Sequence, residues 1–233
     1  MLSRVFQIQP HERRLFAWSA AWFSTVLAAY YIVRPIREAM GSIEGRKGLA
    51  ELFTATFLTM LIAVPVYSQL VNRFSRRRLV PIIYRFLQLH LVGFSVAMAV
   101  VPADQLKQVA NVFFVWVAVY GLFMTSLFWS VMADIYNRAD GKRLFGTIAG
   151  CGTLGSIAAS FLVGAAAEHV GTKTLLVLSA VLMEVGLLCF RLLTSEKDRL
   201  AESHQSTRPA ADPEAAAVNH NRKTTEIKMN KLI

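Results

Sequence analysis

Six apolar stretches constrain the fold of this chain more than any other feature of its sequence. Each is close to the length of about 20 residues with which a helix crosses the hydrocarbon core of a bilayer. They cover residues 15–33, 52–72, 79–101, 110–133, 144–167 and 174–193. Only 17% of the 233 residues are charged, against about 25% in an ordinary soluble domain. We therefore predict an all-α membrane protein with six transmembrane helices.

The positive charge of the chain fits membrane topology better than nucleic-acid binding. Most of the basic residues behind the net charge of +10 lie beside the apolar stretches, and cytoplasmic loops carry an excess of Lys and Arg. One side of the predicted membrane holds Arg4, Arg13, Arg14, Arg73, Arg76, Arg77, Arg78, Arg138, Lys142 and Arg143, and the other holds Arg34, Arg37, Arg46, Lys47, Lys107 and Lys173. The larger group places both termini in the cytoplasm. We expect an integral protein of a bacterial inner membrane.

Residue types that support catalysis or metal binding are scattered. Cys151 and Cys189 fall within predicted spans, and no C-x-x-C motif or Cys/His cluster accompanies them, so neither a disulfide framework nor a metal site is indicated. His90 lies in an apolar stretch and is interpreted as a hydrogen-bonded structural residue. Because no nucleophile is paired with a base, we predict no enzymatic activity and no cofactor.

Arginines in or beside the apolar stretches are the candidates for substrate contact. Arg34 and Arg37 lie in the run YYIVRPIRE (residues 30–38) and share one helix face, which suits a polyanionic substrate because a guanidinium binds phosphate oxygens in a fork. Alternatively they only end the helix, with Glu38 as a local partner for Arg34. Arg85 and Gln88 lie one turn apart in the third stretch, where a charge marks a functional-site hypothesis. Alternatively Arg85 extends to the cytoplasmic interface.

A basic loop, NRFSRRR (residues 72–78), joins the second and third stretches. Its side chains Arg73, Arg76 and Arg77 can hydrogen-bond helix ends and pair with carboxylates, and Asp134 at the end of the fourth stretch is the candidate partner. Such a cluster would gate the cytoplasmic side, and the alternative is a plain topology signal. Asp134 also precedes Arg138 by four residues, so these two could pair within one helix.

The fifth stretch is rich in small residues at helical spacing. The predicted helix-packing residues are Gly146, Gly150, Gly152, Ser156, Ser160 and Gly164. Helices in lipid use such stripes to bring their backbones close, because apolar burial cannot drive their association there. The stripe therefore predicts a helix packed against another helix.

The composition divides the chain into three parts. Residues 1–14 are predicted to be a cytoplasmic N-terminal segment, and residues 15–193 a six-helix transmembrane domain. Residues 194–233 carry almost no large apolar side chains. A segment of that composition cannot bury a core, so we predict a disordered cytoplasmic tail.

The six spans, the basic loop and the Gly-rich fifth helix together resemble the amino-terminal half of a major facilitator superfamily transporter. The resemblance implies a six-helix half built from two three-helix repeats of inverted topology. In that family an Asp-Arg-x-Gly-Arg-Arg loop usually stands where this chain has NRFSRR (residues 72–77). Here Asn72 replaces the acid and Ser75 the glycine.

A narrower likeness is to the ATP/ADP translocases of plastids and intracellular bacteria. Residues 31–38 are similar to the Tyr-x-x-Leu-Arg-Asp-x-Lys-Asp run that ends their first helix, and SLFW (126–129) with KRLFG (142–146) looks like their fourth-to-fifth helix junction. The resemblance implies nucleotide transport. It puts Arg37 at the position of a basic residue implicated in that transport, with Arg34 as its basic neighbour. The translocases carry an acidic residue in the fourth helix, whereas residues 116–129 here contain none.

We expect a secondary transporter, an antiporter that moves an organic, phosphorylated or nucleotide anion by alternating access. Both families need about twelve spans, so the expected partners are lipid, a small anionic substrate and a second six-helix half, with no nucleic acid. That half is an identical chain, another protein or a part of the gene absent here. The alternative is a non-transporting membrane interaction or scaffold protein, or an inactive transporter fragment.

Overall fold

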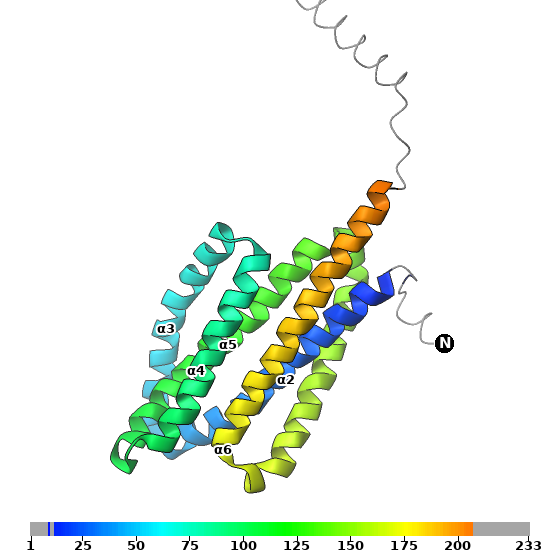
Figure 1. Cartoon of the computed structure of the whole chain (residues 1–233). Helices are drawn as coiled ribbons and strands as arrows, with labels where there is room; N and C mark the ends of the chain where they lie inside the picture. Colours follow the sequence, from blue (N-terminus) through cyan, green and yellow to red (C-terminus); the bar gives the residue numbers. More distant parts are fainter. Residues whose placement is uncertain (1–8, 10–11, 207–233) are drawn as a thin grey trace, which may run out of the picture. The chain divides into compact units, whose positions relative to one another are not determined.

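The computed structural model describes residue 9 and residues 12–206, except for the side chains of 166–168 and 204–206. This described part holds helices and no strand. The helices follow the chain as α2 (Arg13–Ile43), α3 (Gly45–Arg73), α4 (Arg76–Val100), α5 (Ala103–Ile135) and α6 (Arg138–Ser206) (Figure 1).

The long helix α6 contains two of the predicted spans. Gly171 interrupts it with φ 74° and ψ 158°, a backbone conformation that only glycine adopts readily. The chain reverses there, so α6 has a first limb, Arg138–Ala165, and a second limb, His169–Ser203. With α2 to α5 these limbs make six helices in the described residues that are long and apolar enough to cross a membrane. The predicted all-α fold with six spans is confirmed.

The connections between the helices are very short. Glu44 alone separates α2 from α3, and two residues each separate α3 from α4, α4 from α5 and α5 from α6. Asn137 caps the start of α6, because its Oδ1 accepts hydrogen bonds from the backbone N–H groups of Ala139 and Asp140, both at 2.9 Å. Gly45 has φ 68°, which allows the sharp entry into α3.

The helices extend beyond the apolar stretches that predicted them. α2 continues to Ile43, although its apolar stretch ends at Val33, and α3 already begins at Gly45. Arg34 and Arg37 therefore lie inside α2, and the interpretation that they end the first helix is wrong. The reason is that apolar length reports the hydrocarbon thickness, whereas a helix ends where its backbone geometry breaks, here next to Gly45.

One compact unit of the chain ends at Thr194, within the second limb of α6, and residues 195–233 form a second unit. In the second unit the helix continues to Ser206, so the first residues of the predicted tail are helical. Residues 207–233 lie outside the described residues, and their predicted disorder stays a prediction.

Aromatic side chains and a few hydrogen bonds hold the centre of the bundle. Trp22 and Tyr84 are completely buried, and the Trp22 Nε1–H donates to the Tyr84 hydroxyl at 2.6 Å, which joins α2 to α4. The buried Ser179 hydroxyl donates to the Ala29 carbonyl at 2.9 Å, which joins the second limb of α6 to α2. Such polar contacts matter in lipid, where apolar burial does not drive helices together.

The first limb of α6 packs against α2 through part of the small-residue stripe. Gly152 faces Phe23 so closely that a Cβ would overlap its ring, and Gly155 faces the backbone of Ser24. Ser156 is buried and Ser160 is exposed. Among the described residues, a Cβ at Gly146, Gly150 or Gly164 would meet no atom from outside its own stretch of helix within 4 Å. The stripe therefore divides into a part against α2 and an open part.

α3 is the least buried of the spans. Only Leu52 and Ala63 are buried along it, whereas large side chains such as Phe57 and Ile62 are exposed. Figure 1 shows α3, in cyan, at the edge of this unit beside α4 and α5. Its outer face is therefore apolar surface that lipid or another membrane segment can cover.

Candidate functional site

A cavity of about 320 Å³ lies between α2 and α5. Its lining residues are Tyr30 and Arg37 from α2 and Ala118, Gly121, Leu122 and Thr125 from α5. Gly121 allows the two helices to approach, because a Cβ there would lie 2.8 Å from the Tyr30 ring. The cavity combines an aromatic ring, a hydroxyl group and one cation, which are groups that bind organic anions.

Arg37 is held firmly at this cavity. Its Nε–H donates to the Phe114 carbonyl at 3.0 Å, and its Nη1 donates to Glu38 at 3.1 Å. The guanidinium carbon lies 3.8 Å from the centre of the Phe114 ring, a cation–π contact. Only 13% of the side chain is exposed. The cation is therefore largely desolvated and oriented, which strengthens its attraction for an anion.

Arg34 lies one turn before Arg37 and shares its carboxylate. The Arg34 Nε lies 3.9 Å from Glu38 Oε1, so the local pairing predicted for these two residues is present. The Arg34 Nη1 also donates to the Tyr31 hydroxyl at 3.4 Å. About half of the Arg34 side chain is exposed. Glu38 thus balances two guanidiniums in the C-terminal half of α2.

Arg85 and Gln88 do not line the Arg37 cavity. Both contact Glu184 on the second limb of α6. Arg85 donates to the two Glu184 oxygens at 2.5 and 2.9 Å, and Gln88 Nε2 donates to Glu184 Oε2 at 3.1 Å. Sequence reasoning missed Glu184, although an acidic residue inside the apolar stretch 174–193 was a signal that could have found it.

The basic loop does pair with Asp134. The Arg76 Nε lies 3.3 Å from Asp134 Oδ2, and Arg76 Nη1 also donates to the Val71 carbonyl. Arg73, Arg77 and Arg138 are exposed at the same end of the bundle. Because α5 ends at Ile135 and α6 begins at Arg138, Asp134 and Arg138 do not share a helix, and the within-helix pairing suggested by their spacing is not available. The gating role of these residues stays a prediction.

A second ion-pair cluster at this end was not expected. Arg143 Nη2 lies 2.6 Å from Glu12 Oε2 and 3.0 Å from Asp140 Oδ1. Glu12 is buried although it precedes α2. Nearby, the Tyr136 and Ser19 hydroxyls lie 3.0 Å apart, and burial raises the pKa of Tyr136 to about 12. Little in the sequence indicated this cluster, because Glu12 lies outside every apolar stretch.

Comparison with known families decides the class of protein. The family model of the Major Facilitator Superfamily matches residues 15–230. The chain belongs to the major facilitator superfamily. No curated protein and no solved structure matches it. Members of the superfamily are transporters, so the match supports a secondary membrane transporter, embedded in lipid, rather than an enzyme. It does not select the nucleotide-translocase branch.

Membership in the major facilitator superfamily assigns a place to each helix. Each six-helix half of such a transporter consists of two three-helix repeats, which here correspond to α2–α4 and α5–α6. Substrate in this superfamily binds near the bilayer midplane where two halves meet. The Arg37 cavity lies between α2 and α5, which are the first helices of the two repeats.

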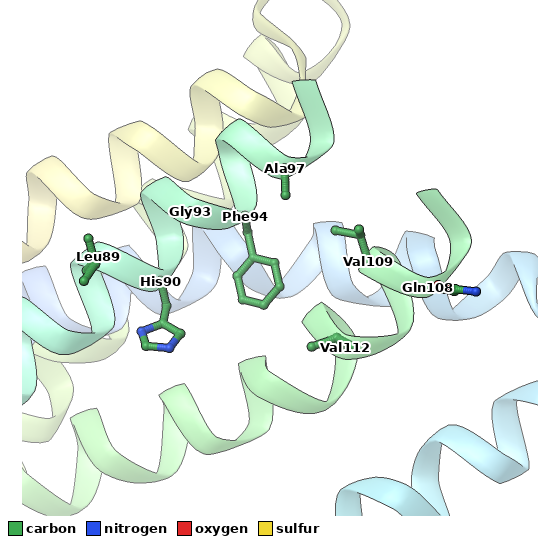
Figure 2. Close-up of a pocket in the computed structure, with 8 residues that line it drawn as sticks. All are labelled: Leu89, His90, Gly93, Phe94, Ala97, Gln108, Val109 and Val112. Carbon is green, nitrogen blue, oxygen red and sulfur yellow. The ribbon is translucent and has the colours of Figure 1, made fainter. Parts of the chain in front are cut away.

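In addition to the Arg37 cavity, the structure has an apolar groove between α4 and α5. Its volume is about 490 Å³. Figure 2 shows Phe94 of α4 opposite Val109 and Val112 of α5, with His90 one turn before Phe94 on the same side of α4. The His90 Nδ1 lies 2.7 Å from the Phe86 carbonyl, and its ring stacks on Trp116. These contacts fit the interpretation of His90 as a hydrogen-bonded structural residue. In the described part of the chain no group of three His, Cys, Asp or Glu side chains could hold a metal.

Proposed function

We propose that the chain is one half of a secondary transporter for an organic anion and that Arg37 binds the anion. The observation that carries this proposal is the cavity between α2 and α5, in which Arg37 is the lining cation and only 13% exposed. Burying a charge costs free energy, and Glu38, which is 54% exposed and shared with Arg34, offsets only part of that cost. An anion in the cavity compensates for that cost.

The hydrogen bonds of Arg37 leave one edge of its guanidinium available. Nε and Nη1 are occupied by Phe114 and Glu38, and within the described residues Nη2 makes no hydrogen bond to the protein. A phosphate or carboxylate oxygen at Nη2 would compete with Glu38 for the same cation. Arg34, on the same carboxylate, can then bind a second oxygen. This pair favours a phosphorylated anion, and nucleotides are one class of that chemistry.

A second six-helix half completes the transporter in this proposal, either an identical chain or a separate one. It would cover the Arg37 cavity and the open glycines of α6, Gly146 and Gly150. Phe114, the partner of Arg37, and Asp134, the partner of Arg76, lie twenty residues apart on α5, which is about 30 Å along a helix. The Arg76–Asp134 pair therefore suits a gate at the end opposite to the anion site, as alternating access requires.

Uptake into liposomes tests the proposal. The assembled protein is reconstituted with labelled inorganic phosphate, a sugar phosphate or ATP outside, and with unlabelled anion inside to detect exchange. Arg37→Ala should reduce uptake by at least about tenfold, the effect of losing roughly 1.4 kcal/mol of binding. Arg46→Ala, an exposed arginine on α3, is the matched control and should keep wild-type uptake.

Either of two results would overturn the anion site. Equal uptake by the Arg37→Ala and wild-type proteins would mean that Arg37 does not bind substrate. No uptake of any anion by an assembly of twelve helices would favour the non-transporting scaffold.

The proposed orientation, with both termini in the cytoplasm of a bacterial cell, is tested separately by labelling a cysteine introduced at Ser75 from each side of the membrane.

A further inference from the structure

The cluster of Arg85, Gln88 and Glu184 is the most unusual polar feature of the membrane spans. It ties α4 to the second limb of α6 through two hydrogen bonds from Arg85 to Glu184, and Gln88 adds one to Glu184 and one to the Ala180 carbonyl at 3.1 Å. Despite these contacts, the side chains of Arg85 and Glu184 are 56% and 48% exposed. The three side chains are thus paired with one another between α4 and the second limb of α6, and the outward side of the cluster is exposed.

This exposure is unexpected at that depth. Arg85 lies nine residues after the start of α4, about 13 Å along the helix, and Glu184 lies fifteen residues into the second limb. Ionisable residues within membrane spans are costly and almost always face the bundle interior or a water-filled cavity. By contrast, the Arg143–Glu12 pair at the bundle end is only 18% and 10% exposed. Something other than acyl chains must cover the Arg85–Glu184 cluster.

The transport pathway does not cover it. On α5, the side chain of Tyr120 points toward the second limb of α6, where its hydroxyl lies 3.4 Å from Ser179. The cavity residues Ala118, Gly121, Leu122 and Thr125 lie on the other side of the same helix, judged by its 100° turn per residue. A partner half seated over the Arg37 cavity therefore leaves the α4/α6 side uncovered.

The residues around the cluster form an apolar rim with a regular spacing. Ile82 and Leu89 lie three residues before and four residues after Arg85, and Val181 and Leu188 hold the same positions around Glu184. All four are between 54% and 71% exposed. The outward face of α4 and the second limb is thus a patch with a polar centre and an apolar border. In lipid, helices associate through such polar contacts rather than through apolar burial.

We propose that this patch, centred on Arg85 and Glu184, binds a second copy of the same chain. Each copy brings one guanidinium and one carboxylate, so a twofold axis sets Arg85 of each copy beside Glu184 of the other and leaves no charge unpaired. An apolar helix offers no partner for either group. An anionic lipid headgroup would be repelled by Glu184. The contact is separate from the Arg37 cavity and does not depend on the transport proposal.

Charge complementation between two variants tests the contact. Arg85→Glu leaves two carboxylates in the patch and Glu184→Arg leaves two guanidiniums, so each variant repels its own copies while the two attract each other. The full-length proteins are labelled with donor or acceptor dyes and reconstituted at low density in phosphatidylcholine liposomes. Energy transfer in each single variant is expected to fall below the wild-type level, also where a copy of the chain serves as the second transporter half. It should return to the wild-type level when donor-labelled Arg85→Glu is mixed with acceptor-labelled Glu184→Arg.

Further variants separate folding and packing effects from the charge effect. The double variant R85E/E184R reverses the internal pair, keeps both charges balanced, and should show wild-type energy transfer. Val181→Trp enlarges the rim without touching the ion pair and should lower transfer as the single charge variants do, whereas Phe57→Trp on exposed α3 should leave it unchanged. Wild-type transfer in either single variant, or no gain on mixing, would overturn the proposal. So would the absence of transfer in the wild type, and specific retention of a labelled anionic lipid would then identify lipid as what covers the patch.

Discussion

The close approach of α2 and the first limb of α6 gives the most quantitative prediction. A Cβ added at Gly155 would lie 2.5 Å from the carbonyl oxygen and 2.8 Å from the Cα of Ser24. Both are backbone atoms and cannot rotate away. Ordinary contact begins at 3.4 Å, so Gly155→Ala has to separate the two helices by up to about 0.9 Å, in a core packed as densely as an organic crystal.

The expected cost follows from that separation. Overpacking of this kind destabilises by about 1–3 kcal/mol, and the shift also strains the hydrogen bond from Ser24 Oγ to the Cys151 carbonyl, now 2.9 Å. Gly150→Ala is the matched control, because it lies on the same helix and, among the described residues, its added Cβ would meet no atom from outside its own stretch of helix within 4 Å. Alanine favours helix over glycine by up to about 1 kcal/mol, so this control should be neutral or more stable than the wild type.

Reversible unfolding in mixed micelles, titrated with sodium dodecyl sulfate and followed by circular dichroism, measures both variants. Gly155→Ala should unfold at a lower detergent fraction than the wild type, and Gly150→Ala at the same fraction or a higher one. If the two variants unfold together, α2 and α6 do not approach as closely as the structure shows, and the reasoning from the Gly155 contact is wrong.

Two further predictions concern the basic end of the bundle. Burial raises the pKa of Tyr136 to about 12, above its ordinary value of 10, so the unfolded chain loses this proton first and stability should fall between pH 10 and pH 12. Tyr136→Phe should flatten that fall in the same unfolding assay, and an unchanged pH dependence would count against it. Asp134→Asn removes the carboxylate that pairs with Arg76 and should speed the labelling of a cysteine introduced at Ser130 by a water-soluble maleimide. Asp134→Glu should keep the wild-type rate, and equal rates in all three proteins would exclude the gate.

The sequence predicted the number and type of helices well, because the length of an apolar stretch is set by the bilayer. It predicted their ends poorly, since helical hydrogen bonding continues into the polar interface until the backbone changes conformation. Arg34 and Arg37 were thus expected at a helix end and lie well inside α2. The reversal at Gly171 falls between the two predicted spans.

The site was predictable in its residue types and not in its grouping. Arg37 and its neighbour Glu38 were visible because they are close in sequence. The pairing of Arg76 with Asp134 followed from knowing which ends of the spans share a membrane side. The partners of Arg85 were not predictable in this way, because Glu184 lies 99 residues away and its contact depends on which helices become neighbours.

The short connections limit how this bundle can move. One or two residues join each pair of successive helices from α2 to α6, and Gly171 alone breaks α6. An extended residue reaches at most about 3.6 Å, so neighbouring helix ends cannot separate by much more than about 10 Å without unwinding. A span therefore cannot slide far past the neighbour to which it is joined. In any large change of shape, successive helices have to keep their joined ends together and can separate only at their unjoined ends.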